Sequence, residues 1–202
     1  MIPICSHRWY KFLCVFARTV LRILHPVIRV EGVENLPEGA AVLCANHSGI
    51  LDPVWIIVWS RLERHPRIMA KKELFRKKLL AYFFYKIGAF PVDRQGSDIA
   101  AIKTAFHTLK DDNKLLIFPE GTRIRKGKVP QAHSGATLIA SRMHAPVVPI
   151  YLSAKRFLFS PVRIVIGKPY HLEFAGPKPT AEELQDRADT LMEQIYDMGE
   201  KK

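Results

Sequence analysis

Residues 41–52 of the chain read AVLCANHSGILD, and the rest of the predicted fold can be built outward from this stretch. The apolar run Ala41–Ala45 predicts a buried strand that ends just before a polar pair containing His47. A helix is predicted over Pro53–Glu63, because proline suits its first turn and Asp52 stands at the N-cap position. The stretch therefore predicts a strand, a turn and a helix, which is the unit that α/β domains repeat.

The same alternation continues on both sides of this unit. Further strands are predicted at Val27–Val33, Arg67–Ala70, Ala89–Val92, Lys114–Phe118, Val147–Leu152 and Val162–Ile166. Further helices are predicted at Leu74–Lys86, Ser97–Lys110, Gly135–Met143 and Thr180–Met198. This alternation favours one α/β domain over residues 29–202, with a mixed, largely parallel sheet and helices on both of its faces.

Residues 1–28 are expected to form an N-terminal amphipathic helix over roughly residues 6–25. At about 100° per residue, its basic residues fall in one sector and its apolar residues on the opposite side. The basic set is Arg8, Lys11, Arg18, Arg22 and His25, and the apolar set is Trp9, Phe12, Leu13, Phe16, Val20, Ile23 and Leu24. This pattern is typical of a helix lying in a membrane interface, and also of a surface helix packed on the protein's own core.

The balance of charge points to an acidic partner. The formal net charge of +12 predicts attraction to nucleic acid, to an anionic membrane or to phosphate-bearing substrates. We find no nucleic-acid recognition motif, so no nucleic-acid partner is expected. No apolar run approaches the roughly 20 residues of a membrane-spanning helix. The three cysteines form no CxxC pair and indicate a reduced, cytosol-facing protein, and no metal-site spacing is present.

His47 and Asp52 are the first candidates for catalysis. Histidine has a reference pKa of about 6.5, so it can accept a proton at neutral pH. A turn that folds Asp52 back onto the imidazole would fix its tautomer, as in the base-and-orienter half of a serine hydrolase triad. Ser48 is too close in sequence for a comfortable bond to the ring, so we expect a substrate hydroxyl to be activated instead. The structural alternative is that Asp52 only caps a helix and His47 is an ordinary loop residue.

Two further strand ends carry groups suited to a phosphate. The loop Phe118–Arg123 contains Gly121, whose sharp turn is expected to expose backbone N–H groups, followed by Thr122 and Arg123. Glu120 would repel a phosphate, so it is expected to anchor the loop or to orient Arg123. Arg94 follows another strand and is a second phosphate candidate, although a solvated strand-end charge is the commoner fate of a lone arginine.

Four motifs in this order resemble the lysophosphatidic acid acyltransferases of the glycerolipid acyltransferase superfamily. Asn46–Asp52 is similar to that family's HX4D block, Gly88–Arg94 to its second block, Phe118–Arg123 to its EGTR block and Val147–Ile150 to its apolar-proline block. The stretch Met69–Phe75 also resembles bacterial members, and the likeness covers roughly residues 29–170.

The resemblance implies a role for each site residue. His47 would be the general base and Asp52 its orienter. The acceptor's phosphate would be held at Arg94, Gly121 and Arg123, with Glu120 shaping that loop and Lys71 adding positive charge. Thr122 belongs to the same phosphate loop. Apart from the resemblance, the sequence offers backbone N–H groups near Ser48 and Gly49, or Lys71, as candidate donors to the oxyanion of the reaction.

The reaction implied is transfer of a fatty acyl group to the sn-2 hydroxyl of lysophosphatidic acid, giving phosphatidic acid. The acyl donor would be acyl-CoA or acyl-carrier protein, and no cofactor or metal is required. The enzyme is expected to be peripheral or monotopic on the cytoplasmic face of the cell membrane, bound to its anionic surface. Two alternatives stay open: the same chemistry on glycerol 3-phosphate or another lysophospholipid, and a non-catalytic protein that binds anionic membranes.

Overall fold

The central feature of the fold is a sheet that is parallel over most of its width. The computed structural model describes residues 5–93, 98–122, 132–154, 158–176 and 178–200. Within these residues seven strands form one sheet in the order β1-β7-β6-β2-β5-β3-β4. The strands are β1 (Ile28–Glu31), β2 (Ala41–Ala45), β3 (Arg67–Lys71), β4 (Ala89–Val92), β5 (Lys114–Ile117), β6 (Val147–Leu152) and β7 (Val162–Ile166).

Strand β2 lies at the middle of the sheet and carries the site at its end. It pairs in parallel with β5 on one side and with β6 on the other, so that Leu43 lies opposite Leu116 and Val148. All five residues of β2 are buried, as expected for a parallel strand covered on both faces. Only the β6–β7 pairing is antiparallel among the described strands, which confirms the predicted mixed, largely parallel sheet.

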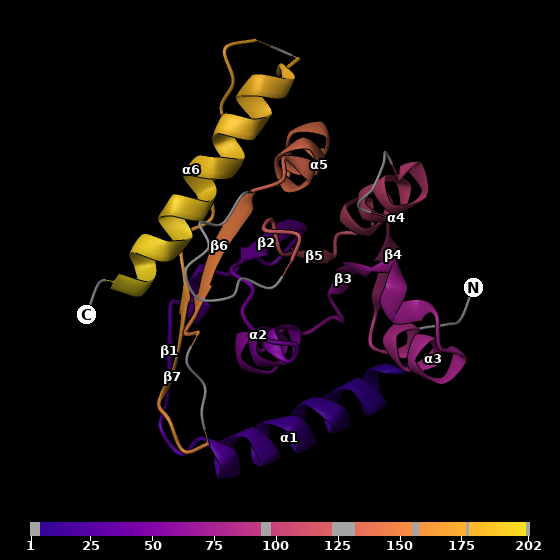
Figure 1. The fold of residues 1–202 in the computed structure, drawn as a ribbon, viewed down its shortest axis with the longest axis vertical. Coiled ribbons are helices and arrows are strands. Elements are labelled where there is room, and N and C mark those ends of the chain that lie inside the picture. Colours follow the sequence, from indigo (N-terminus) through magenta and orange to yellow (C-terminus); the bar gives the residue numbers. More distant parts are fainter. Residues whose placement is uncertain (1–4, 94–97, 123–131, 155–157, 177, 201–202) are drawn as a thin grey trace.

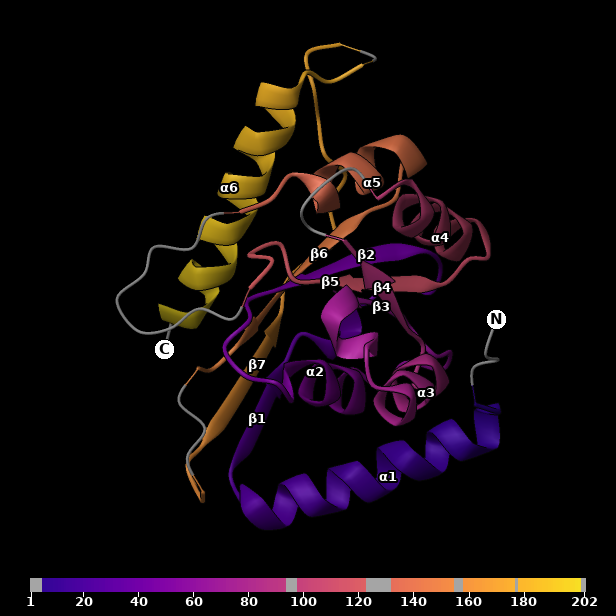
Figure 2. The same ribbon diagram turned by 45° about the vertical axis from the view of Figure 1, so that its right-hand side comes forward.

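Helices cover both faces of the sheet, as Figures 1 and 2 show. One face carries α2 (Asp52–Ser60) and α3 (Lys78–Lys86), with α1 (His7–Leu24) lying beneath α2. The other face carries α4 (Ile99–Lys110), α5 (Gly135–Met143) and α6 (Ala181–Glu200). Alternate residues of β2 serve the two cores: Leu43 packs in the α2 core, whereas Val42 and Cys44 pack in the core beneath α4, α5 and α6.

Two predicted helices are shorter in the structure than the pattern suggested. Helix α2 ends at Ser60, because Arg61 takes a left-handed conformation with φ 51°. The predicted helix Leu74–Lys86 is divided into a 3-10 turn, η2 (Lys72–Phe75), and α3. The division lets the Phe75 ring pack on that of Phe84 at 5.6 Å between centroids, whereas one continuous helix would separate them by roughly 13 Å along its axis. A second short 3-10 turn, η1 (Val33–Asn35), follows β1.

Helix α1 uses both of its faces. It buries Tyr10 and Leu21, and the guanidinium groups of Arg18 and Arg22 lie 5.4 Å from the ring centroid of Trp59 on α2. The opposite face leaves large apolar side chains exposed, namely Trp9, Phe12, Val15, Phe16, Val20, Ile23 and Leu24. Within the described residues, no helix combines the length and apolar composition needed to cross a bilayer.

Candidate active site

The site lies where β2 ends, and Asn46 fixes that end. The Asn46 side chain donates to the Leu152 carbonyl at 2.9 Å and accepts from the Leu152 N–H at 2.8 Å, so it joins β2 to the end of β6. Both bonds are buried, where an unpaired backbone group would be costly. His47 therefore leaves the sheet from a fixed point.

His47 and Asp52 form the pair that the spacing predicted. His47 Nδ1 lies 2.9 Å from Asp52 Oδ2, and the aspartate side chain is completely buried. The same oxygen accepts the backbone N–H groups of Ser48 at 2.6 Å and Gly49 at 2.8 Å. The turn between the two residues is thus closed around the carboxylate.

The predicted N-cap role of Asp52 is wrong by one position. Leu51 is the N-cap of α2 and Asp52 is the first helical residue, with no side-chain cap bond at this helix end. The carboxylate is turned toward the preceding loop, because the N–H groups of Ser48 and Gly49 bind it there. Those two N–H groups are therefore occupied, which removes them from the expected donors for an oxyanion.

The His47 ring is held flat against Phe118. The ring centroids are 4.3 Å apart with an interplanar angle of 29°. An Nδ1–H that donates to Asp52 leaves Nε2 as the unprotonated ring nitrogen, able to accept a proton from a substrate. The His47 side chain is 16% exposed and lines a cavity, so a substrate can reach it.

Glu120 supports His47 from the other side. Its Oε2 accepts the His47 backbone N–H at 2.8 Å, and its Oε1 accepts the hydroxyl of Tyr196 on α6. The residue is only 3% exposed, and this burial raises the pKa of its carboxyl to about 7. These contacts favour an anchoring role for Glu120. Tyr196 was missed by the sequence reasoning, because nothing marks one tyrosine in a C-terminal amphipathic helix.

The turn after β5 is tighter than the sequence suggested. Gly121 has φ +66°, and a Cβ there would lie 2.6 Å from the His133 ring, so glycine is required. The Gly121 N–H donates to the Phe118 carbonyl at 3.0 Å, and the Thr122 N–H donates to the Glu120 carbonyl at 2.7 Å. The expectation that this turn exposes backbone N–H groups is therefore wrong at both positions.

Of the cationic side chains predicted to bind the phosphate, Lys71 lies within the described residues. Lys71 ends β3, lines the same cavity as His47 and lies 3.5 Å from the Glu73 carboxylate. Its side chain is half exposed, and Thr122 is exposed on the same cavity. Arg94 and Arg123 lie outside the described residues.

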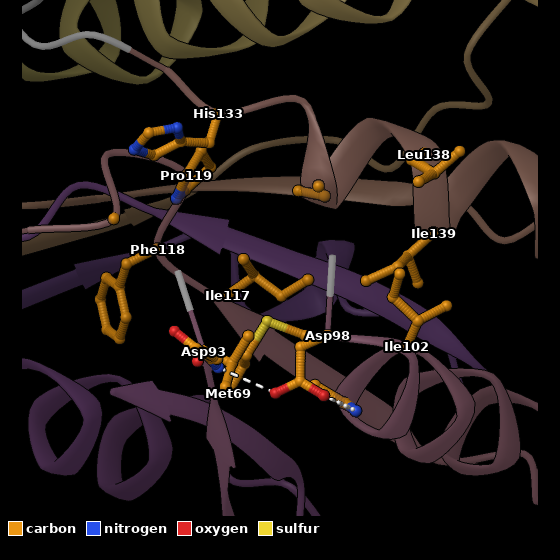
Figure 3. Close-up of a pocket in the computed structure, with 15 residues that line it drawn as sticks. Met69, Asp93, Asp98, Ile102, Ile117, Phe118, Pro119, His133, Leu138 and Ile139 are labelled. Atoms are coloured by element: carbon orange, nitrogen blue, oxygen red, sulfur yellow. Dashed lines mark hydrogen bonds between the residues drawn. The ribbon is translucent and has the colours of Figure 1, made fainter. Parts of the chain in front are cut away.

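Two cavities lie beside Phe118, whose ring stacks on that of His47. The first has a volume of about 470 Å³ and combines His47, Lys71 and Thr122 with apolar side chains that include Leu74 and Phe84. The second, of about 230 Å³, lies on the other face of the sheet between α4 and α5. Figure 3 shows its wall, with Ile102 and Ile139 facing one another and Ile117 and Met69 at its base. Phe118 and Met69 line both cavities, so they form the partition between them.

No group of three or more histidine, cysteine, aspartate or glutamate side chains in the described part of the chain could hold a metal ion. The expectation that the reaction needs neither metal nor cofactor stays a prediction.

Comparison with known proteins identifies the class of protein that has this fold. A family model described as Acyltransferase matches residues 27–153, which is more than half of the chain. The chain therefore belongs to the acyltransferase family, and the predicted class of enzyme, an O-acyltransferase, is confirmed.

Individual relatives place the chain within this family. It is 35% identical to the 1-acyl-sn-glycerol-3-phosphate acyltransferase of Bacillus subtilis, over 95% of this chain and 98% of that protein. It is 28% identical to the enzyme of the same name from Pseudomonas aeruginosa, over 90% of this chain and 72% of that one. The crystal structure of the 1-acyl-sn-glycerophosphate acyltransferase of Thermotoga maritima has the same fold, with a TM-score of 0.69 and 22% identity over 94% of this chain and 79% of that chain.

Proposed function

We propose that this protein transfers a fatty acyl group from an acyl thioester to the sn-2 hydroxyl of lysophosphatidic acid, giving phosphatidic acid. The observation that carries the proposal is the His47–Asp52 pair, bonded at 2.9 Å and facing a cavity through the imidazole. The names of the relatives, which are 1-acyl-sn-glycerol-3-phosphate acyltransferases, supply the acceptor.

The proposed reaction is direct transfer. His47 Nε2 removes the proton of the acceptor hydroxyl as its oxygen attacks the thioester carbonyl. Asp52, already bonded to Nδ1, stabilises the imidazolium that forms. The C–S bond then breaks, and the thiolate of coenzyme A or of acyl-carrier protein leaves and receives that proton. General-base catalysis of this kind contributes about 10²–10⁴-fold in rate.

The cavities suit substrates that carry both a phosphate and a fatty chain. Lys71 and Thr122 offer a cation and a hydroxyl beside His47, and Arg94 and Arg123 are proposed to complete the phosphate site. Lys71 is also the proposed donor to the oxyanion, because the N–H groups of Ser48 and Gly49 already bind Asp52. Apolar side chains line the remainder of both cavities and give fatty chains a place to lie.

We also propose that the exposed apolar face of α1 lies in an anionic membrane surface. Phe12 and Phe16 are about 60% exposed there, whereas Arg18 faces the protein and donates to the Val58 carbonyl at 2.5 Å. A helix that merely packed on its own domain would bury its aromatic side chains and expose its arginines.

Further exposed apolar side chains lie on the segments that contact the two ends of α1. At its beginning, the Cys5 N–H donates to the carbonyl of Lys86, the last residue of α3. At its end, the Leu24 carbonyl accepts the Phe159 N–H. These neighbours expose Leu79, Leu80, Tyr82, Phe83, Leu158 and Phe159. Exposed apolar residues gathered in this way mark a membrane or protein contact, and the net charge of +12 favours an anionic membrane. The free thiols of Cys5, Cys14 and Cys44 support a cytoplasmic face.

The test of the proposed function is acyl transfer on anionic lipid vesicles with a radiolabelled acyl thioester. Lysophosphatidic acid, glycerol 3-phosphate and a zwitterionic lysophospholipid would be supplied as competing acceptors, each with acyl-CoA and with acyl-carrier protein. We expect the label to appear in phosphatidic acid. Label in another product would identify an alternative acceptor, and no transfer to any acceptor from either donor would leave only membrane binding.

A further inference from the structure

A residue outside the motifs joins the catalytic pair to the far end of the chain. The Tyr196 hydroxyl on α6 donates to Glu120 Oε1, and Glu120 Oε2 accepts the backbone N–H of His47 at 2.8 Å. We propose that Tyr196 is a positioning residue of acyl transfer, an inference that rests on the proposed function. Tyr196 orients the Glu120 carboxylate, and the carboxylate in turn fixes the main chain of His47, the proposed general base.

The Tyr196 hydroxyl comes from a rigidly docked helix. Helix α6 packs on the sheet through Leu191 and Ile195, both of which are fully buried. Gly199 permits this close approach, because a Cβ at that position would lie 2.3 Å from the ring of Tyr151 on β6. A donor held by packing in this way can set the direction of its acceptor, as a supporting shell must do at a catalytic site.

Both oxygens of Glu120 are engaged, and both contacts depend on its charge. A bond to an ionised carboxylate is roughly twice as strong as one to a neutral group. The pKa of Glu120 is raised to about 7 as the net of four effects: burial and the nearby charge of Asp52 raise it, and the bonds from Tyr196 and His47 lower it. Burial also raises the pKa of Tyr196, so its hydroxyl keeps the proton that it donates. Loss of that donor would leave Glu120 protonated at neutral pH and would weaken its bond to the His47 main chain.

The groups around Glu120 come from several elements of the described structure. His47 follows β2, Asp52 begins α2, His133 packs against Gly121, and Tyr151 of β6 lies beside Tyr196. Tyr196 lines neither of the two cavities beside His47. Its removal is therefore expected to act on turnover rather than on substrate binding.

The experiment compares Tyr196→Phe with Tyr151→Phe, a matched control that removes a hydroxyl from the same helix–sheet contact. Losing a bond to a charged group corresponds to about one to two pH units in the pKa of Glu120. For Tyr196→Phe we expect kcat at pH 7 to fall about five- to fiftyfold and to return within about twofold of the parent by pH 9, with KM unchanged. Tyr151→Phe should keep the parent's pH profile. Replacement of Tyr196 by 3-fluorotyrosine, a stronger hydrogen-bond donor of nearly the same shape, should move the acid limb of the pH profile of kcat to lower pH.

A readout independent of turnover separates this inference from the proposed function. Carbon NMR of protein labelled in its glutamate carboxyl groups should show Glu120 titrating at higher pH in Tyr196→Phe than in the parent. An unchanged Glu120 titration overturns the inference even if acyl transfer is established. A loss of kcat in Tyr196→Phe that is equal at all pH values also overturns it, because that result describes a structural defect.

Discussion

Burial of Glu120 should make the protein's stability depend on pH in a predictable direction. The pKa of this carboxyl rises from 4.5 to about 7 in the folded protein, which is about 2.5 units. At 1.36 kcal/mol per unit, the folded state loses about 3 kcal/mol of stability from this group as the pH increases. The sign follows from proton binding. Between pH 4.5 and 7 the folded state binds the proton more tightly than the unfolded chain, so this contribution is complete below pH 4.5 and is lost through about pH 7.

The substitution Glu120→Gln removes the titration and keeps the shape of the side chain. We expect the stability of this variant relative to the parent to increase by about 3 kcal/mol between pH 4.5 and pH 8. The assay is urea denaturation of both proteins at several pH values, with coincident fluorescence and circular dichroism transitions as the check for two-state unfolding. Glu183→Gln is a control of opposite sign, because the Thr180 N–H lowers the pKa of that exposed carboxyl. A stability difference between Glu120→Gln and the parent that is constant across this pH range would refute the reasoning.

Three further predictions follow from contacts at the site and on α1. Asp52→Asn should lower kcat about a thousandfold, because the amide cannot stabilise the imidazolium, while circular dichroism should show an intact fold. Activity within tenfold of the parent would contradict the orienting role of Asp52. Asn46→Ala should cost about 2–4 kcal/mol in urea denaturation, because both of its bonds to the β6 backbone are buried; a cost below about 1 kcal/mol would show that the strand ends do not need it. The double variant Phe12→Ser and Phe16→Ser should bind anionic vesicles at least about tenfold more weakly than the parent in a sedimentation assay. The control Ile99→Ser, which changes a similarly exposed residue on α4, should bind as the parent does. Equal binding by the parent and both variants would exclude α1 from the membrane contact.

The fold was largely predictable because its signals are local. Strand β2 is an unbroken apolar run, and helical patterns separate most of the other strands. The existence of the strands and their order along the chain therefore follow from periodicity alone. The pairing of His47 with Asp52 was also predictable, because only four residues separate them in the turn from a strand to a helix, and so short a turn has few conformations.

The sequence pattern failed where distant residues decide the structure. The packing of Phe75 on Phe84 breaks a segment whose own pattern is that of one helix. The amphipathic pattern of α1 gives its two faces but not which of them meets the domain, and that choice depends on Trp59 of α2. The partner of Glu120 could not be found at all, because Tyr196 lies 76 residues away on a helix whose docking depends on packing.

Some errors concerned backbone groups at the site itself. The N–H groups of Gly49 and Gly121 looked available for an oxyanion or a phosphate, since glycine turns often present them. In the structure one binds Asp52 and the other the Phe118 carbonyl, so each stabilises the loop instead. Residue types and spacing locate such turns, whereas the acceptor of each N–H depends on the folded geometry.

The central claim, that His47 is the general base of acyl transfer, is tested most directly by comparing two histidine variants. His47→Ala removes the buried pair, and His107→Ala removes a second His–Asp pair, bonded at 2.8 Å but exposed on α4 away from both cavities. Transfer of a radiolabelled acyl group to lysophosphatidic acid on vesicles should fall about 10²–10⁴-fold in His47→Ala and be unchanged in His107→Ala. Parent-like transfer by a folded His47→Ala protein would contradict the account.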